Sequence, residues 1–283
     1  KTNLTATKNG LILWATAVVP SLFPFFVSTE LLSYTSVIKY LGKWLNPIMR
    51  PLFNVPGEGA FAFLMGLISG YPVGAKIVSI FMEQGIVTKQ EAERLLAFTN
   101  NSGPLFIIGT VGITLFGSTT IGLLLFVTHM LACITVGIVL RFFDKSSTIS
   151  NNYHYNYSNK SVSISSLGEV LGKSITNSIS TILMIGGFVV IFSVVISILN
   201  QSGILSGVSL MLSPVLCAIG FPTELIKPVL AGIVELTNGV SLVANTHIKA
   251  ISVNIVSASF LLGFGGISVL LQVFSIISKA GLS

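Results

Sequence analysis

Charged side chains are scarce in this sequence. Asp, Glu, Lys and Arg together make up 8% of the 283 residues, whereas about 25% is usual for a soluble domain. Hydrophobic residues reach 52%, and the mean hydropathy is +0.90. These values exclude an ordinary soluble globular domain. They indicate an integral membrane protein whose main partner is the lipid bilayer.

Other function classes are excluded by residues that are missing. No basic stripe with interleaved aromatic residues is present, so we expect no nucleic-acid partner. The sequence also lacks a Ser-His-Asp set, paired catalytic carboxylates, a metal-ligand cluster and a P-loop, so we expect no enzyme, metal or cofactor. The two cysteines, Cys133 and Cys217, lie in apolar runs. We expect both to be small buried hydrophobic residues.

What the sequence does contain is a membrane-competent segment, Gly59–Glu83, with a break at its middle (SGYPVG). Pro72 removes a backbone donor and disfavours helix just before it, while Gly70 and Gly74 permit backbone angles that other residues avoid. Broken backbone at membrane depth requires protein or water to satisfy its freed polar groups. A broken hairpin followed directly by Lys76 is typical of a transporter's substrate site.

The rest of the chain alternates apolar spans with interruptions. Gly10–Ser33 is long enough to span, with kinks at its two prolines and with Glu30 at the interface. A capping box at Thr88 and Glu91 begins a charged helix. Further along we expect a surface helix at Ser36–Phe53, a break at Thr99–Pro104, spans at Ser118–Phe143 and Asn177–Leu199, a neutral surface helix at Ser206–Ile219, and two segments, Glu224–Ala250 and Ser252–Ser278, broken at Glu235–Gly239 and Gly263–Gly266.

The chain divides into two membrane repeats, 1–143 and 167–283, joined by a polar cytoplasmic loop at 144–166 that we expect to be flexible. Both repeats follow one order: span, surface helix, broken hairpin, unwound helix. One constant offset aligns Pro56 with Pro222 and Gly66 with Gly232. The second repeat stops before its last span, so we expect the native protein to continue past Ser283.

Charge predicts the orientation. If the hairpins re-enter on one side, the first repeat has an odd number of crossings, and the repeats are inverted. Segments 36–53, 84–98 and 141–173 then share one side, with nine of the 15 Lys and Arg residues. The positive-inside rule makes that side cytoplasmic. The expected fold class is an all-α polytopic membrane protein of two inverted repeats, each with a span, a surface helix, a re-entrant broken hairpin and an unwound helix.

The interruptions supply the candidate substrate-binding residues. Lys76 is the leading candidate to bind a substrate carboxylate, because an intramembrane Lys costs roughly 2.5–3.5 kcal/mol and so marks function by default. The alternative is a Lys that snorkels to the interface. Glu235 could couple protons, bind a cation or pair with Lys76. The predicted site comprises Ser69, Gly70, Tyr71, Gly74, Lys76, Asn100, Asn101, Ser102, Gly103, Glu235, Thr237, Asn238, Gly239, Gly265 and Gly266.

Several of these residues also have a purely structural interpretation. The amides and hydroxyls of Asn100, Asn101 and Ser102, like those of Thr237 and Asn238, could cap the broken helix ends. Capping and substrate binding are compatible at one position. Tyr71 could stack on a flat ligand or simply pack at the break.

Three stretches closely resemble the nucleoside-recognition (Gate) superfamily, and within it a family of sporulation integral membrane proteins. They are SGYPVGAK at Ser69–Lys76, EAERLLAFTNNSGPLFIIGTVG at Glu91–Gly112 and GIVELTNG at Gly232–Gly239. More distantly, the order of features is similar to the concentrative nucleoside transporters, which have two inverted repeats and an elevator motion. The resemblance implies a role in endospore formation, namely passage of dipicolinic acid across the outer forespore membrane.

These observations leave three hypotheses. The leading one is a membrane transporter of a small organic anion, dipicolinate by resemblance, with H⁺ or Na⁺ as the expected coupling ion. The second keeps the fold and transports a nucleoside or nucleobase. The third is a passive scaffold in a larger sporulation membrane complex. Assembly into a homo-oligomer is compatible with all three.

Overall fold

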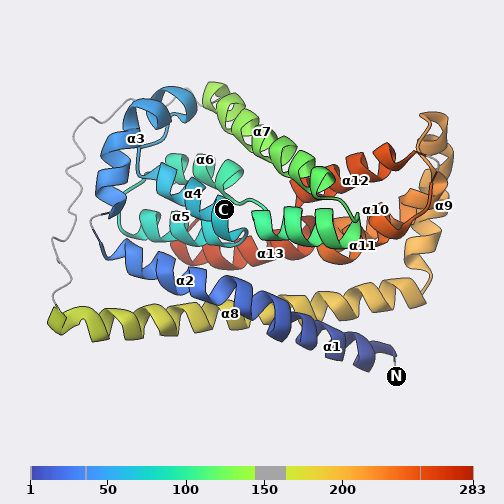
Figure 1. The fold of residues 1–283 in the computed structure, drawn as a ribbon, viewed down its shortest axis with the longest axis horizontal. Coiled ribbons are helices and arrows are strands. Elements are labelled where there is room, and N and C mark those ends of the chain that lie inside the picture. The colour runs from blue at the N-terminus through green and yellow to red at the C-terminus, as the bar shows by residue number, and fades with distance from the viewer. Residues whose placement is uncertain (1, 36, 144–163, 249, 283) are drawn as a thin grey trace. The chain divides into compact units, whose positions relative to one another are not determined.

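The computed structural model describes residues 2–35, 37–143, 164–248 and 250–282. No strand occurs within these ranges (Figure 1). The chain forms two compact units, each assembled from separate stretches. Unit 1 contains Lys1–Pro20, Pro104–Met130 and Leu183–Gln272, and unit 2 contains Ser21–Gly103, Leu131–Ile182 and Val273–Ser283. The all-helical fold class is therefore confirmed for the described residues.

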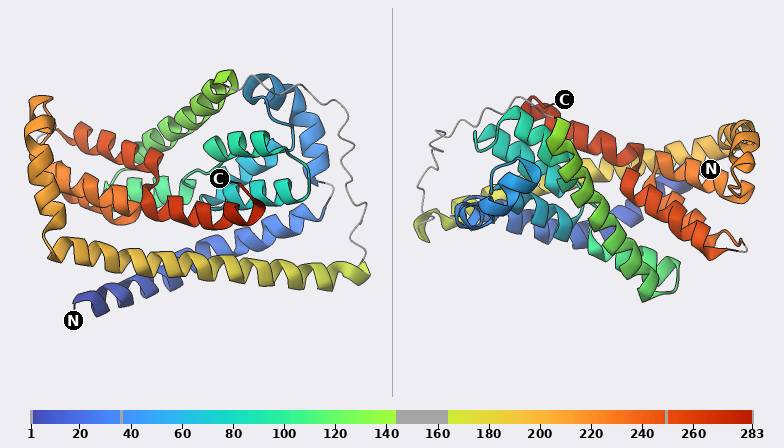
Figure 2. Two further views of the ribbon diagram at one scale, coloured as in Figure 1. Left: turned by 180° about the vertical axis from the view of Figure 1, so that it is seen from behind. Right: turned by 90° about the horizontal axis from the view of Figure 1, so that it is seen from above.

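Unit 2 is built around the first broken hairpin. In chain order its helices are most of α2 (Val19–Ser33), α3 (Val37–Phe53), α4 (Gly59–Ser69), α5 (Val73–Glu83), α6 (Lys89–Thr99), the end of α7 (Thr119–Phe143), the start of α8 (Ile164–Gln201) and η3 (Ser278–Ala280). Helices α4, α5 and α6 pack on one another, as the two further views show (Figure 2).

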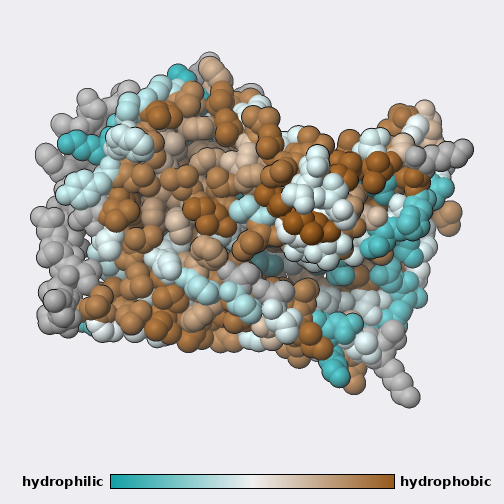
Figure 3. All heavy atoms as spheres, viewed as in Figure 1, coloured by the Kyte–Doolittle hydropathy of each residue, from teal (hydrophilic) through white to brown (hydrophobic). Residues whose placement is uncertain are grey.

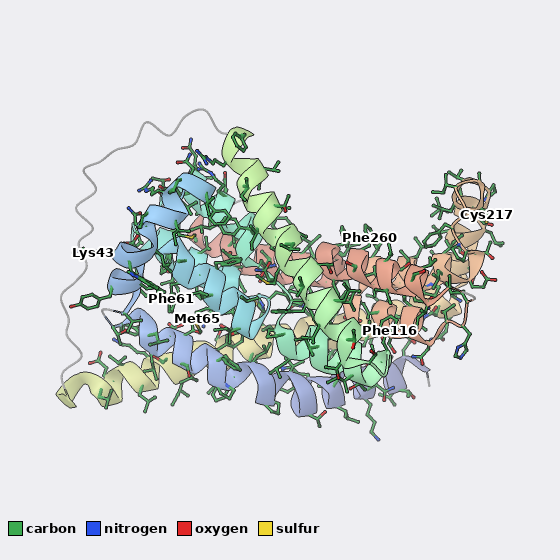
Figure 4. All side chains as sticks on the ribbon, turned by 45° about the horizontal axis from the view of Figure 1, so that its top comes forward. Lys43, Phe61, Met65, Phe116, Cys217 and Phe260 are labelled. Carbon is green, nitrogen blue, oxygen red and sulfur yellow. The ribbon has the colours of Figure 1, made fainter. Side chains whose placement is uncertain are left out.

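Aromatic rings fill the core of unit 2. The Phe98 ring stacks on Phe53 at 4.8 Å between centroids. The ring centroids of Phe61 on α4 and Phe81 on α5 lie 6.3 Å apart (Figure 4). Gly137 of α7 faces Phe53 and Phe98, where a side chain would collide with the rings. This packing fixes α4, α5 and α6 around the break that holds the predicted site.

Unit 1 is built around the second broken hairpin. Its helices are α1 (Thr2–Leu13), the π-helical η1 (Trp14–Val18) and η2 (Leu105–Leu115), parts of α7 and α8, then α9 (Ile204–Ala218), α10 (Thr223–Val234), α11 (Leu236–Asn245), α12 (Ile251–Phe264) and most of α13 (Gly266–Ile277). Helix α10 packs on α9, α11 and α12, and α11 also contacts η2. Leu225, Leu236 and Leu261 are fully buried there.

Three helical segments of the described chain are long and apolar enough to cross a membrane: Thr119–Phe142, Leu167–Gln201 and Ile251–Ile277. Large apolar side chains are exposed along them, among them Val127 on α7, Leu183 on α8 and Phe260 on α12 (Figure 4). Hydrophobic residues also dominate the face drawn in Figure 3. Because such surfaces are unfavourable in water, they confirm that the chain is an integral membrane protein.

The structure corrects several expected boundaries. Helix begins before Gly10 and continues to Ser33 through the π-helical turn η1. Pro20 explains that turn, since it cannot donate a hydrogen bond to Thr16 and its ring crowds that carbonyl. Helix α8 begins at Ile164, well before the expected span at Asn177. The predicted loop 144–166 lies outside the described residues except for 164–166, which begin α8.

Other local predictions are confirmed. Residues 37–53 form α3, and α9 forms where the neutral helix is expected. The capping box is present, with Thr88 Oγ1 accepting from the Glu91 amide and Glu91 Oε2 accepting from the Thr88 amide.

The cysteine prediction is wrong for Cys217, which is exposed on α9, while Cys133 is half-buried. The inverted relation of the repeats and the re-entrance of their hairpins remain predictions.

Candidate functional site

The break between α4 and α5 is a tight turn made by Gly70, Tyr71 and Pro72. Gly70 has φ +81° and ψ 179°, a conformation essentially restricted to glycine. Its amide donates to the Gly66 carbonyl at 2.9 Å, and its carbonyl accepts from the Val73 amide at 3.1 Å. Both backbone polar groups of Gly70 are thus satisfied locally, and the predicted role of Gly70 in the turn is confirmed.

Gly66 and Gly74 hold the end of α6 against this hairpin. A Cβ on Gly66 would lie 2.0 Å from the Thr99 carbonyl oxygen, and one on Gly74 would lie 2.1 Å from it. Real Cβ atoms never approach that closely, so glycine is required at both positions for packing. The expectation that Gly74 supplies an unusual backbone angle is wrong: it lies in the first turn of α5 with ordinary helical geometry.

The hairpin break at Gly70 and the break at Thr99–Pro104 contact each other through their backbones. A Cβ on Gly70 would lie 2.9 Å from the Gly103 amide nitrogen. Asn101 is buried, donates through Nδ2 to the Phe98 carbonyl at 2.9 Å, and accepts from Cys133 Sγ at 2.9 Å. Its capping role is therefore observed. By contrast, Asn100 Oδ1 is buried and has no hydrogen-bond partner among the described residues.

Lys76 forms a buried ion pair with Glu30. Its Nζ lies 3.1 Å from Glu30 Oε2, and the two side chains are 13% and 7% exposed. Asn177 Nδ2 of α8 donates to the other carboxylate oxygen at 2.7 Å, and Nζ lies 5.4 Å from the centroid of the Phe26 ring. Lys76 is therefore held inside the protein, and Glu30, expected at the interface, is buried. Three helices, α2, α5 and α8, supply this cluster.

Unit 1 repeats the arrangement with different residues. A Cβ on Gly239 of α11 would lie 1.9 Å from Gly232 Cα of α10, so these half-helices touch at glycine. Gly266 has φ +84°, and a Cβ there would lie 3.1 Å from the Leu236 amide nitrogen. In each unit, then, the break of the hairpin packs against the break of the next long segment. The interruptions are narrower than predicted, since only Glu235 and Gly265 separate the helices.

Glu235 caps α11. Its carboxylate accepts from the Thr237 amide at 3.0 Å and from the Asn238 amide at 2.8 Å. Thr237, Asn238 and Gly239 accordingly lie in the first turn of α11 rather than in unwound chain. A helix N-terminus carries partial positive charge, which explains why a carboxylate is favourable there.

The predicted site residues thus fall into two groups. Those from Ser69 to Gly103 gather in unit 2, and those from Glu235 to Gly266 gather in unit 1. Their membership in a substrate site remains a prediction. Two members of this cluster were not predicted: Glu30, the partner of Lys76, and Asn177, which donates to Glu30. Glu30 carried a usable signal, because an acid within an apolar span needs a cationic partner and few are available.

Comparison with known proteins assigns the family. The nucleoside recognition (Gate) family profile matches residues 15–146 and 182–281 of the chain. This protein belongs to the Gate family. The matched Gate residues include both broken hairpins and both long segments that follow them. Asn177 lies outside the matched ranges.

One curated relative is similar along nearly the whole of this Gate protein. The sporulation integral membrane protein YlbJ of Bacillus subtilis (strain 168) is 36% identical over 287 residues, covering 97% of this chain and 70% of YlbJ. The resemblance seen in the three sequence stretches is confirmed. No solved structure gives a significant match.

Proposed function

We propose that this Gate-family membrane protein transports a small organic anion and that dipicolinate is its substrate. The observation that carries the proposal is the position of Lys76, a buried cation one turn into α5 and directly after a glycine break. An ionisable side chain buried in a membrane protein is a functional candidate by default. Broken helices whose N-termini face a site are the usual substrate-binding device of secondary transporters.

The chemistry of the region suits a carboxylate. The ammonium group of Lys76 offers three donors, and the first turn of α5 adds amide groups with partial positive charge. Asn100 Oδ1 is a buried acceptor without a partner among the described residues, and because ionised dipicolinate carries only acceptors, it would reach the ligand through a bridging water. A flat dicarboxylate matches these groups better than an apolar solute does.

The relative's name supports the biological setting. YlbJ is described as a sporulation integral membrane protein. We infer the same setting for this chain, with the outer forespore membrane as its location and dipicolinate passage during spore formation as its role.

A nucleoside or nucleobase substrate is the second candidate, because the family is described by nucleoside recognition. Uptake by purified protein in proteoliposomes separates the two. We expect accumulation of labelled dipicolinate that excess unlabelled dipicolinate abolishes and excess uridine or adenosine does not. Competition by the nucleosides would favour the second candidate. Uptake of neither ligand by folded protein would favour a scaffold.

A further inference from the structure

The ion pair of Lys76 with Glu30 poses a problem for anion binding. In the observed state the cation is already neutralised by a carboxylate at 3.1 Å. A substrate carboxylate brought beside Lys76 would also lie close to the Glu30 carboxylate. Two like charges in a site of low dielectric repel strongly, so both carboxylates cannot stay ionised there at little cost.

Three hydroxyl groups without partners in the described part of the chain lie on the same helices as Glu30 and Asn177, within one turn of them. Thr29 precedes Glu30 on α2, and Ser174 and Ser178 flank Asn177 on one face of α8. Their hydroxyl oxygens are buried and have no hydrogen-bond partner among the described residues. Buried hydroxyl groups are satisfied in the great majority of cases, so unsatisfied ones on the helices that supply the pair indicate a place for a ligand or water with acceptor atoms.

We propose that Glu30 is the proton-carrying carboxylate of the transporter: it takes up one proton when a substrate carboxylate binds Lys76. This inference rests on the proposed function and adds the coupling ion and the group that carries it. The substrate carboxylate replaces Glu30 as the counter-ion of the ammonium group. Thr29, Ser174 and Ser178 donate hydrogen bonds to it.

The proton offsets part of the charge that the substrate brings. The empty site holds one carboxylate and one ammonium group and is neutral. The loaded site holds the protonated Glu30 carboxyl, the ammonium group and the two substrate carboxylates, so its net charge is −1, whereas with Glu30 ionised it would be −2. The proton comes from water on the side to which the site opens, bonds to a Glu30 oxygen, and leaves on the other side with the anion. The smaller net charge of the protonated, loaded site lowers the cost of carrying it through the bilayer.

The helices that pack around Glu30 present both charged and neutral groups. Lys76 faces it from α5, and α8 presents the neutral Asn177. Tyr34 lies one turn further along α2. Lys173 lies one turn before Asn177 on α8 and is engaged by Glu169, with Nζ and Oε1 2.6 Å apart. Lys76 is the cation that pairs with Glu30 and that the substrate carboxylate would take over.

The pH dependence of dipicolinate binding tests this inference. Both substrate carboxyls are ionised between pH 6 and 8, so they contribute no titration of their own. If one proton is taken up on binding, the dissociation constant of the wild type should rise by up to about tenfold per pH unit. Glu30→Gln imitates the protonated carboxyl, so its dissociation constant should be flat across this range. Glu30→Asp should keep the slope, and Glu93→Gln, which changes an exposed carboxylate on α6, should match the wild type.

Transport gives a second readout. In proteoliposomes Glu30→Gln should lose accumulation driven by a pH gradient but keep exchange of labelled for unlabelled dipicolinate. If the variant does not fold, a pH-sensitive dye in wild-type vesicles decides: we expect proton entry in step with the anion. Two results would overturn the role of Glu30 but leave the proposed function intact. One is wild-type transport without proton movement, and the other is a dissociation constant that depends on pH in Glu30→Gln as it does in the wild type. Absence of any dipicolinate binding or transport by folded wild type overturns the proposed function as well.

Discussion

Lys76 of α5 and Glu30 of α2 form an ion pair whose nitrogen and oxygen lie 3.1 Å apart in the interior of unit 2. Asn177 of α8 completes it from a third helix. Removing either charge would leave the other buried without compensation, which is costly in a protein interior. Breaking the pair is therefore costly, and the pair keeps a cation at the hairpin break.

The first prediction concerns this pair. Lys76→Met should lower the free energy of unfolding by about 3–5 kcal/mol, because it leaves the Glu30 carboxylate buried and unpaired. The double variant Lys76→Met/Glu30→Gln should recover most of that loss. Lys89→Met is the matched control, since Lys89 and Glu93 form an exposed pair at 3.9 Å worth at most about 1 kcal/mol. Denaturant unfolding in detergent micelles measures all three. Equal losses at Lys76 and Lys89 would contradict the buried pair.

The second prediction concerns the glycine contacts with Thr99. Gly66→Ala and Gly74→Ala place a methyl group about 2 Å from a backbone oxygen, so each should destabilise the protein by at least about 1–3 kcal/mol, the usual cost of overpacking. Gly187→Ala in α8 is the control, because nothing lies within 4 Å of its added Cβ. That variant should be neutral or slightly stabilising. Thermal unfolding midpoints that are the same in all three variants would refute the close packing.

Helices and breaks could be predicted well from the sequence where their signals are local. Pro72 and Gly70 mark the hairpin turn by their backbone preferences, and Thr88 with Glu91 marks a helix start. The number of residues in each helix interruption was harder to predict. Glu235 alone interrupts its segment, because a carboxylate that caps α11 lets the next residues resume helix at once.

The partner of Lys76 could not be predicted with the same certainty. Glu30 lies far from Lys76 in the chain, and both it and Glu235 were available as acids. Which one meets Lys76 depends on how α2 packs on α5 and α8, and local sequence does not specify that packing. Asn177 carried no signal at all, since an amide at the start of an apolar run is ordinary.

The third prediction concerns Gly70. Gly70→Ala forces a side chain into a conformation with φ +81° and ψ 179°, and its Cβ would meet the Gly103 amide at 2.9 Å. We expect a loss of roughly 1–3 kcal/mol from backbone strain together with loss of uptake. Gly85→Ala shares a positive φ of +68° but has open space around it, so it should cost about 1–2 kcal/mol and keep uptake. Normal uptake in folded Gly70→Ala would show that the break geometry is dispensable.

The fourth prediction separates two roles of Glu235. As an N-cap it should tolerate Gln, whose carbonyl oxygen still accepts a hydrogen bond, whereas Ala should cost about 0.5–2 kcal/mol. If Glu235 only caps α11, Glu235→Gln transports normally and Glu235→Ala is merely less stable. Loss of uptake in stable Glu235→Gln protein would instead assign the coupling charge to unit 1 and contradict the assignment to Glu30.

The most direct measurement of the central claim is dipicolinate uptake into proteoliposomes by the wild type, Lys76→Arg and the charge-free pair variant Lys76→Met/Glu30→Gln. The pair variant leaves no buried charge uncompensated, so a loss of uptake there does not reflect misfolding. Exchange of labelled for unlabelled dipicolinate, which Glu30→Gln alone should keep, assigns a loss in the pair variant to the missing cation. We predict full uptake by the wild type, partial uptake by Lys76→Arg and none by the pair variant. Uptake by the folded pair variant at the wild-type rate would contradict a substrate-binding role for Lys76.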